Sequence, residues 1–529
     1  MKSRAQSVQQ TSSRRGFILA IVTIVVVLLS LAAYNYSDTM IVEHQASAMG
    51  GRDVAARMAA ESAIELVATR IMEHDADDSI NLYNDPDTFR GHLIMDSAVS
   101  RGRVLSSVLA FDETATGVVR FGLASENSKF NLNSLLAIAQ SEDDLPEEEQ
   151  LGLEYLAMQS IPNMTDDIVD AILDWLDSDD DRRPGGAESA DYETLSVSYS
   201  CKNGPMETIE ELLKVQGVTP ALFYGEDANH NGMEDIGEDT NTDGIFDLGW
   251  QAYLTVSSRE RNTNPDGDAK IDLNMGQMTK LYDAVEELYG EEAASFVCAF
   301  RLGGTDYVTA QTSNLPQLTV DGTISRNDID FTVVPAYRFN SIYDLIGGET
   351  GSVKMLTGVD QSFTSPWGED AATLLDVFPD LEKNFSVTDD TAIEGRININ
   401  QARREVLLTL QPAMTEVAAD SIISARPAAD LESASSGILA RRNTAAWILA
   451  EGIVDLETLR QLGPYITVGG DVYRFQALGH FEEGGPTTRL EAEVDASEYP
   501  PAVRFVRDLT SLGRGYRTDT FLPAQNQNR

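Results

Sequence analysis

Basic residues are scarce in this 529-residue chain, which has 39 Lys and Arg against 85 Asp and Glu and a formal net charge of −46. A surface with such an excess of negative charge repels nucleic acid and anionic lipid, and it attracts cations. Histidine is also rare, with five residues scattered along the chain, and no His-Glu-x-x-His, Cys-x-x-Cys or Gly-x-Ser-x-Gly motif occurs. These absences argue against a nucleic-acid-binding protein and against an enzyme.

Cysteine is almost absent as well, because Cys201 and Cys298 are the only two and lie far apart in the sequence. In an oxidising compartment they could form a disulfide, and two buried free thiols are at least as good an interpretation. The hydrophobic content of 42% is high enough to exclude global disorder. A chain of this length can hold two or three domains, each with a core of its own.

Proline and glycine are absent from residues 17–49, and charged residues are absent from 17–33. About 20 apolar residues are enough to cross a bilayer core as a helix. A membrane-spanning helix is therefore predicted over 17–36. The arginines that precede it, together with Tyr34 and Tyr36 at its far end, predict an N-terminus in the cytoplasm.

The helical pattern continues beyond the membrane-length stretch. Ala60, Ile64, Val67 and Ile71 keep the spacing of one helix face. The sequence therefore predicts one long helix, with its first half in lipid and its second half against a soluble domain. The glycine pair at 50–51 should kink or loosen this helix, because glycine is a poor helix former.

A family resemblance begins at the boundary between Gly16 and Phe17. A short basic leader that ends in glycine, followed by phenylalanine and an uninterrupted apolar run, resembles the cleavage site of type IV pilins and type II secretion pseudopilins. The resemblance implies that a prepilin peptidase cuts after Gly16 and methylates Phe17. Most members have glutamate at the fifth mature position, which is Ile21 here, and that departure is a feature of the minor pseudopilin K of the general secretion pathway. The alternative is an uncleaved signal anchor.

Alternating polarity predicts the sheet against which the helix packs. Short strands are expected at 103–110 and 117–124, and the clearest ones come near the C-terminus, at 473–481 and 490–494, with a third at 503–506. The predicted fold class is α+β, with a long N-terminal transmembrane helix on an antiparallel sheet that has one solvent-exposed face. The resemblance to pseudopilin K implies a large helical domain inserted into this sheet, and calcium-binding loops are also predicted.

A five-residue motif (basic, apolar, polar, apolar, Asn) occurs three times, each time before a helix, and predicts related helical units. Asn133 or Ser134 is expected to cap the first of these helices. The first and third copies resemble segments of pseudopilin K, whose helical domain is inserted into a pilin-like sheet, here from about Ser125 to Asp430. The third copy is also similar to helix-hairpin-helix units, but it lacks the glycines that bring backbone amides onto a DNA phosphate. The copies are Lys129–Asn133, Lys270–Asn274 and Arg396–Asn400.

A predicted amphipathic helix, capped by Thr165, ends in a group of carboxylates that begins at Asp174. The helix dipole disfavours anions at this end, so a cation is expected there, either Arg182 or Arg183 or a bound calcium ion. The segment from Asp174 to Tyr192 resembles the pseudopilin K signature, whose helical domain binds calcium. By that resemblance the expected ligands are Asp177, Asp179, Glu188 and Asp191.

A 12-residue repeat follows, in which residues 226–237 align with 238–249. Each copy has oxygen-bearing side chains at alternate positions and a glycine for the sharp turn, which is the pattern of a calcium loop. The loops are too close together to have helices between them, so compact loops like those of thrombospondin type 3 or dockerin sequences are predicted, with a solvated acidic linker as the alternative. The predicted ligands are Asp227, Asn229, Asn231, Asp235 and Glu238 in the first loop, and Asp239, Asn241, Asp243 and Asp247 in the second.

The predicted function is that of a minor pseudopilin of the type II secretion system. By resemblance, such a protein initiates the pseudopilus and caps its tip, spans the inner membrane once and keeps its C-terminal domain in the periplasm. Its expected partners are other minor pseudopilins in a hetero-oligomeric tip complex, the prepilin peptidase and exported proteins, with no nucleic acid. The alternative is a membrane-anchored, calcium-dependent adhesin or binding module.

The predicted order along the chain is a prepilin leader (1–16), the transmembrane half of the N-terminal helix (17–36), the rest of that helix with the first strands (37–124), a K-type helical domain (125–225), the tandem calcium loops (226–250), further helical and strand units (251–430), the C-terminal helices and antiparallel strands (431–515) and a polar tail (516–529), frayed from about Arg514.

Overall fold

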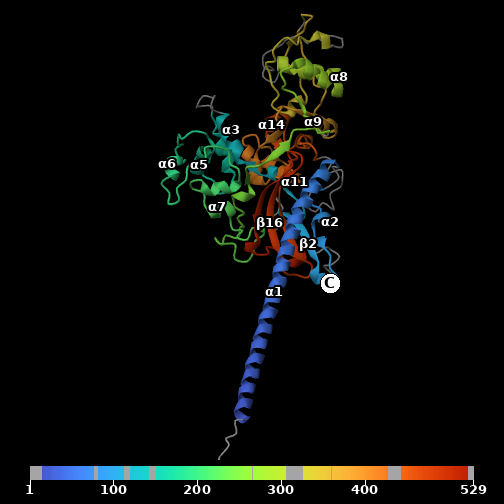
Figure 1. The fold of residues 1–529 in the computed structure, drawn as a ribbon. Helices are drawn as coiled ribbons and strands as arrows, with labels where there is room; N and C mark the ends of the chain where they lie inside the picture. Colours follow the sequence, from blue (N-terminus) through green and yellow to red (C-terminus); the bar gives the residue numbers. More distant parts are fainter. Residues whose placement is uncertain are drawn as a thin grey trace, which may run out of the picture.

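The most prominent element of the computed structural model is α1 (Arg15–Ala76), a single long helix whose first half projects from a mixed α/β body (Figure 1). The long N-terminal helix is therefore confirmed. All side chains from Phe17 to Gly51 are exposed. The glycines at 50–51 do not end the helix, because α1 continues through both of them; that they kink or loosen it stays a prediction. The structure describes residues 15–76, 81–111, 119–141, 150–264, 266–304, 326–358, 360–426 and 442–521, so most of the predicted leader lies outside the described residues.

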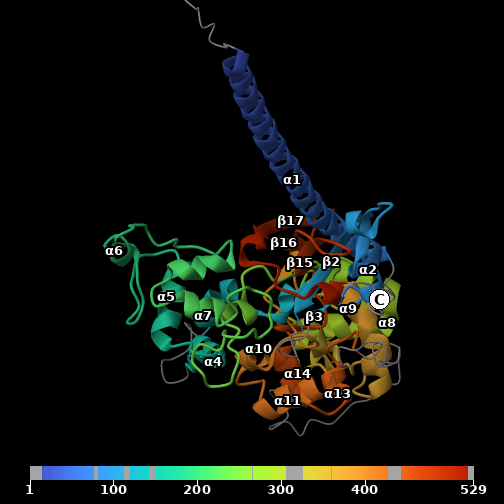
Figure 2. The same cartoon turned by 90° about the horizontal axis from the view of Figure 1, so that it is seen from below.

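The second half of α1 packs on an antiparallel sheet. Small and aliphatic side chains on one face of the helix, from Ala56 to Ile71, are buried against β2 (Val104–Phe111), β15 (Val472–Phe481) and β16 (Thr488–Asp495). This spacing is the one that predicted the helix, so the apolar stripe is the face that joins α1 to the sheet. Figure 2 shows these strands side by side below the body end of α1.

The sheet has seven strands, and its main path runs in the order β1-β2-β15-β16-β17. The predicted strands at 103–110, 473–481, 490–494 and 503–506 are confirmed. The remaining elements of this layer are α2 (Pro86–Phe89), β1 (His92–Met95), η1 (Ser100–Gly102), β3 (Val119–Arg120), which pairs with β2, β4 (Ala124–Ser125), which pairs with β15, β17 (Ala502–Asp508) and η11 (Thr510–Leu512).

The predicted solvent-exposed face is wrong for the two central strands. All eight residues of β16 are buried, and so are Gln476 and His480 of β15. Segments from elsewhere in the chain cover this face, since Gln476 donates a hydrogen bond to the backbone carbonyl of His230 at 2.7 Å, and Arg474 pairs with Glu126 at 3.2 Å. The alternating polar residues are therefore paired inside the protein rather than hydrated.

The C-terminal segment also covers this face. Tyr516 and Phe521 are buried; the Tyr516 hydroxyl donates to Oε1 of Gln476 at 3.0 Å, and Phe521 packs on the His480 ring. The prediction of a frayed tail from Arg514 is therefore wrong as far as η12 (Thr518–Phe521). Residues 522–529 lie outside the described part of the chain.

Ser125 and Tyr473 are paired across β4 and β15; the chain leaves the sheet after Ser125 and returns to it at Val472, where β15 begins. Everything between them is an insertion into the sheet. The predicted end of the insertion near Asp430 is therefore too early, because the helices that follow it also precede the return to β15. Asp430 itself lies outside the described residues.

Three consecutive units of the same construction make up the insertion. In each unit the five-residue motif forms a short strand that pairs in parallel with a strand farther along the chain, and the helices lie between the two strands. This confirms the predicted relation among the three motifs. The strand pairs are β5 (Phe130–Asn131) with β6 (Leu254–Thr255), β8 (Ile271–Asp272) with β11 (Phe385–Ser386), and β13 (Ile397–Asn398) with β14 (Ile466–Thr467).

The final asparagine of each motif donates a side-chain hydrogen bond to a backbone carbonyl elsewhere in its unit. Nδ2 of Asn133 donates to the carbonyl of Met206 at 3.0 Å, and Nδ2 of Asn274 donates to that of Phe339 at 2.9 Å. As predicted, Ser134 is the N-terminal flanking residue of the helix α3 (Leu135–Gln140), although its side chain makes no capping hydrogen bond. The side chain of Asn131 caps the 3-10 turn that precedes this helix. Asn400, in the third motif, donates to the carbonyl of Arg442 at 3.0 Å.

The second unit, which contains α8, lies farthest from the exposed half of α1 (Figure 1). Cys201 of the first unit and Cys298 of the second are buried free thiols, so they form no disulfide. The first unit has η2 (Glu126–Ser128), η3 (Leu132–Ser134), α3 (Leu135–Gln140), α4 (Leu153–Gln159), α5 (Asp166–Leu176), α6 (Ser189–Tyr192), η4 (Ile209–Lys214), α7 (Pro220–Tyr224) and η5 (Trp250–Ala252).

The second unit has α8 (Met278–Gly303), η7 (Arg326–Asp328), η8 (Ile342–Leu345), β9 (Val353–Lys354), β10 (Asp360–Gln361), η9 (Thr373–Val377) and α9 (Phe378–Asn384), and the third has α10 (Arg404–Leu407), η10 (Leu408–Leu410), α11 (Glu416–Ala425), α13 (Trp447–Ala450) and α14 (Leu456–Leu462). Between the units, β7 (Arg259–Arg261) pairs with β12 (Ala392–Glu394).

Candidate metal centre

The helix α5 positions the acidic residues of the first unit. Its apolar side chains are buried from Ile168 to Leu176, as the periodicity predicts, and two aspartates occupy its first turn, where the helix dipole favours them. Thr165 is the N-terminal flanking residue, although its side chain makes no capping hydrogen bond. At the other end the chain turns into an extended conformation at Asp177, which directs the following carboxylates toward the start of α6.

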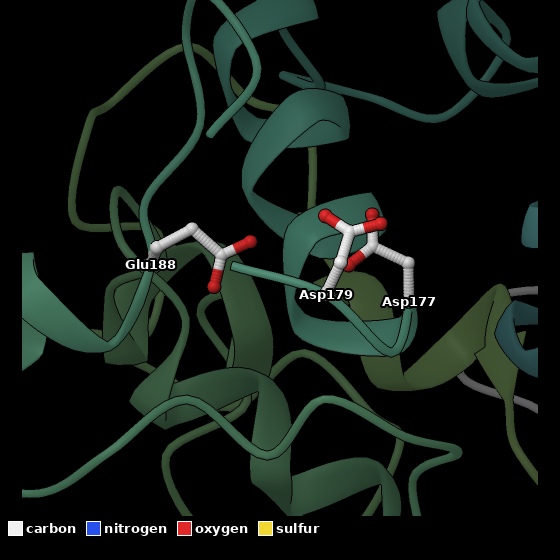
Figure 3. A group of neighbouring side chains, drawn as sticks. All are labelled: Asp177, Asp179 and Glu188. Carbon is white, nitrogen blue, oxygen red and sulfur yellow. The ribbon is translucent and has the colours of Figure 1, made fainter. Parts of the chain in front are cut away.

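Three carboxylates meet at this turn. Asp177 and Asp179 follow α5, and Glu188 precedes α6. One oxygen from each lies within 4.8 Å of the other two, and the carboxylate of Glu188 faces those of the two aspartates (Figure 3). Hard cations such as Ca²⁺ bind oxygen ligands of this kind.

Three carboxylate oxygens of this group lack a hydrogen-bond partner. Both oxygens of Glu188 and Oδ1 of Asp177 are buried without a hydrogen-bond partner, and the two residues are only 3% and 7% exposed. Burial, with added repulsion from neighbouring aspartates, raises the pKa of Glu188 to about 7. Leaving buried charged oxygens without a partner is costly, so the site favours a cation that contacts these atoms.

Arg183 supplies one positive charge but does not reach the whole group. Its Nη1 lies 3.0 Å from Oδ1 of the fully buried Asp174 and also contacts Oδ2 of Asp177. Burial raises the pKa of Asp174, and the hydrogen bonds from Arg183 oppose that rise. Both cations that the sequence left open, the arginine and a metal ion, are therefore compatible with the site, since each would contact different oxygens.

Asp191 lies beside the three carboxylates but not within the group. Its carboxylate accepts a hydrogen bond from the backbone amide of Glu188 at 3.1 Å and pairs with Arg182 at 3.4 Å. Of the four ligands expected from resemblance, the structure thus brings three together. Asp174 was not among those four expected ligands. The sequence nevertheless indicated that it belongs to this group, because it lies at the acidic C-terminal end of α5, one turn before Asp177.

The first of the two repeated loops, residues 226–237, wraps around its own side chains. Asp227 accepts hydrogen bonds from the backbone amides of Asn231 and Gly232 at 3.0 and 2.7 Å. The side-chain amides of Asn229 and Asn231 both donate hydrogen bonds to Oδ2 of Asp235, at 2.6 and 2.9 Å. Oδ1 of Asn229 is buried and has no hydrogen-bond partner. Side-chain hydrogen bonds therefore join Asn229, Asn231 and Asp235, while the carboxylate of Asp227 binds backbone amides of the same loop.

The second loop repeats the backbone of the first. The fifth position of each copy has φ of 56° at His230 and 59° at Thr242, and the seventh has φ of 69° at Gly232 and 76° at Gly244. Asp239 accepts hydrogen bonds from two backbone amides, as Asp227 does in the first loop. The side chains of the second loop lie at the surface, so the aligned register produces two similar turns in different surroundings. Three predicted ligands of the second loop remain. Asn241 and Asp243 are exposed, and burial raises the pKa of Asp247. Glu238, the last predicted ligand of the first loop, accepts a hydrogen bond from the backbone amide of Asp235 at 2.9 Å.

Glu226 joins the two loops, a role that the ligand pattern did not reveal. One of its oxygens accepts hydrogen bonds from the backbone amide and the hydroxyl of Thr240, at 2.8 and 2.9 Å, and the other accepts one from the amide of Asp247 at 3.4 Å. The sequence did contain an indication of this role, because Glu226 and Glu238 are the equivalent first residues of the two copies of the repeat.

The first loop is also bound to the back of the sheet. The buried Arg489 donates to the carbonyl of Asn229, and Nδ2 of Asn231 donates to the carbonyl of Gly515 at 2.6 Å. Gly232 lies so close to the Phe111 ring that a Cβ there would be 2.4 Å from it, which only glycine permits. The conformation of this loop is therefore coupled to the packing of the sheet.

The described chain thus combines a long apolar helix with an antiparallel sheet that is interrupted by inserted helical units. Residues 128–224 match the family described as type II secretion system (T2SS), protein K. This match confirms the resemblance to the protein K family and includes the whole acidic group at the end of α5. No curated protein matches the chain.

Among solved structures, the chain is similar to one in the crystal structure of the GspK-GspI-GspJ complex from the enterotoxigenic Escherichia coli type 2 secretion system. The two chains share 12% identity with a TM-score of 0.34, and the match covers 85% of this chain and 96% of that one.

Proposed function

We propose that this chain is a K-type minor pseudopilin that starts the pseudopilus of a type II secretion system and caps its tip. The observation that carries this proposal is the family match over residues 128–224, in a chain that begins with an apolar helix. Its partners would be other minor pseudopilins and, at the tip, exported proteins.

The anchor in this proposal is the first part of α1. From Phe17 onward α1 is long and apolar enough to cross a membrane, and the apolar stretch is not buried within the protein. A prepilin peptidase would cut between Gly16 and Phe17. The helix would span the inner membrane once, and the body would lie in the periplasm because the basic residues precede the helix.

The capping role is supported by Ile21. Cleavage leaves a positive amine on Phe17 within lipid, where an unpaired charge costs at least about 3 kcal/mol. In pilins the fifth-position glutamate of an arriving subunit is thought to neutralise the amine of the subunit ahead of it. The first subunit has none ahead, so isoleucine suits it, while its own amine can still be paired by the next arrival. The inserted units lie at the opposite end of the molecule from the exposed half of α1 (Figure 1), where they would block a further subunit.

The calcium part of the proposal rests on the unpartnered oxygens of the first unit. Asp177, Asp179 and Glu188 would bind one Ca²⁺, and Asp191 would orient Glu188 through its backbone amide. Backbone carbonyls and water would complete the six to eight oxygens that Ca²⁺ prefers. The tandem loops would bind further Ca²⁺ through Asp227, Asn229, Asn231, Asp235 and Glu238, and through Asp239, Asn241, Asp243 and Asp247.

The mass of the N-terminal peptide from assembled material tests the pseudopilin proposal. A methylated Phe17 is expected, because assembly requires cleavage after Gly16. An intact Met1 in assembled fibres would exclude it.

Cysteine cross-linking tests the capping role. A cysteine near Phe17 should cross-link to a cysteine at the fifth position of another pseudopilin, whereas a cysteine at Ile21 should find no partner ahead of it. Recovery of this chain along the shaft, with neighbours on both sides, would exclude capping and leave only membership of the fibre.

A further inference from the structure

Only one of the two arginines that follow the acidic turn enters the carboxylate group. Arg183 contacts Asp174 and Asp177 through its guanidinium, and its backbone amide also donates to the Asp174 carboxylate at 3.2 Å. Arg182 points outward, and its side chain is about half exposed. The chain thus provides its own cation at one side of the group.

The two sides of the group differ in how they are neutralised. Arg183 binds Oδ2 of Asp177, whereas Oδ1 of the same carboxylate has no hydrogen-bond partner and neither does Glu188. Asp177 is therefore held by one oxygen, and its other oxygen has no hydrogen-bond partner. Four carboxylates share one guanidinium, so the negative charge is only partly balanced.

We propose that Arg183 sets the calcium affinity of this site, as a positioning residue that is also a built-in competing cation. In the calcium-free chain it neutralises Asp174 and Asp177, which allows the first unit to fold before calcium is bound. The same positive charge repels the incoming ion and weakens its binding. This inference rests on the proposed calcium site.

The proposal predicts two effects of opposite sign. Replacing Arg183 with glutamine should strengthen calcium binding by about tenfold, because a unit charge a few ångströms away is removed from a partly buried site. The same change should lower the melting temperature in chelator, because Asp174 and Asp177 then lack a cation. A merely structural arginine would weaken both calcium binding and stability when removed.

The experiment uses the full-length chain in detergent micelles, with Asp227→Asn and Asp239→Asn present in every sample so that the tandem loops do not contribute. Tb³⁺ luminescence, sensitised by the nearby Trp175, reports on the site, and competition with Ca²⁺ gives the dissociation constant. The variants are Arg183→Gln, Arg183→Lys, which keeps the charge, and Arg182→Gln, which removes the neighbouring exposed charge. Arg183→Gln is purified in calcium so that it is folded at the start.

Tighter binding in Arg183→Gln, binding within about twofold of the parent in Arg183→Lys, and less than a threefold change in Arg182→Gln would support the proposal. If the parent binds Ca²⁺ and Arg183→Gln binds it equally well or more weakly, the role of Arg183 is wrong while the calcium site stands. If the parent gives no signal that Ca²⁺ displaces, the calcium site itself is wrong, and the role of Arg183 fails with it.

Discussion

Gly479 of β15 lies directly against the backbone of Ala56 in α1. A Cβ on Gly479 would be 1.8 Å from the carbonyl oxygen of Ala56, a separation that no real side chain can occupy. The two elements therefore touch without a side chain between them at this point, and the contact sets how closely the helix approaches the sheet.

Replacing Gly479 with alanine should lower the free energy of unfolding by about 2 kcal/mol or more, because α1 must move away from β15 and loses packing along its buried stripe. The measurement is the melting temperature of the full-length chain in detergent. Gly276→Ala is the control, since a Cβ there would meet no atom within 4 Å. An equal melting temperature for both variants would contradict the close approach.

Glu188→Gln should have opposite effects with and without calcium. In chelator the variant should melt a few degrees higher than the parent, because a buried and repelled carboxylate becomes neutral. In calcium it should gain less stability than the parent, for which a site at 100 times its dissociation constant adds about 2.7 kcal/mol. Differential scanning calorimetry in chelator and in calcium measures both effects.

Glu193→Gln is the matched control for that variant, because Glu193 is exposed and lies close by in the sequence. Its melting temperature should follow that of the parent in both buffers. The same calcium-induced rise in Glu188→Gln as in the parent would show that Glu188 is not a ligand.

The two tandem loops should contribute unequally to stability. Asp227→Asn should remove more of the calcium-dependent rise in melting temperature than Asp239→Asn, because the first loop is fastened to the sheet while the second lies at the surface. Melting curves of the two single variants, each with and without calcium, test this. A larger loss in Asp239→Asn would contradict the coupling of the first loop to the sheet.

Glu382 should give the stability of the insertion a pH dependence. It links two units, since its Oε1 accepts hydrogen bonds from the hydroxyls of Tyr343 at 2.9 Å and Thr444 at 2.6 Å. Burial raises its pKa from 4.5 to about 7. The folded chain therefore binds this proton more tightly than the unfolded chain, so stability is highest below pH 4.5 and falls as the pH rises to about 7.

Glu382→Gln cannot ionise and should remove this fall. Relative to the parent, the variant should gain stability at pH 8, on the order of 2 kcal/mol, and gain little at pH 5. Melting temperatures of the variant and the parent at the two pH values measure the difference. An equal shift at both would mean that ionisation of Glu382 is not the cause.

Asn274 should be needed for the second unit. Its side chain exchanges hydrogen bonds with the backbone of Phe339 and donates to the carbonyl of Val387 at 2.9 Å. Alanine would leave these buried groups unpaired, at a cost of about 1–3 kcal/mol each. Hydrogen exchange should then rise in α8 and β11 but not in the first unit. Asn340→Ala, at an exposed neighbouring position, should leave exchange unchanged.

The elements that could be predicted from the sequence are those that carry a local period. The apolar stripe of α1 and the alternation in β15 and β16 are of this kind, and the repeated motifs recur with their strands and asparagines in place. The covering of the sheet could not be predicted in this way, because His230 and Tyr516 reach Gln476 from distant parts of the chain. A polar residue at an alternating position has the same local pattern whether it meets water or a buried partner.

The candidate site divides in a similar way. The resemblance implied Asp177, Asp179 and Glu188, which the structure brings together. The choice between Arg182 and Arg183 could not be made from adjacent, chemically identical residues. It depends on the direction of the backbone after α5, which places one arginine on Asp174 and turns the other outward. Glu226 was missed because its oxygens accept backbone hydrogen bonds, which a pattern of ligand spacing does not include.

The pairing of Ser125 with Tyr473 has a consequence for the order of folding. Each inserted unit closes with its own pair of parallel strands, so its contacts can form as soon as that unit has been made. The sheet forms later, because β15, the strand that pairs with β2 and β4, is synthesised only after the whole insertion. Contacts between residues so distant in the sequence also form slowly. A chain cut short anywhere before β15 would retain α1 and its finished units but only part of the surface on which α1 packs. The strands that are synthesised last thus complete the surface on which the N-terminal helix α1 packs.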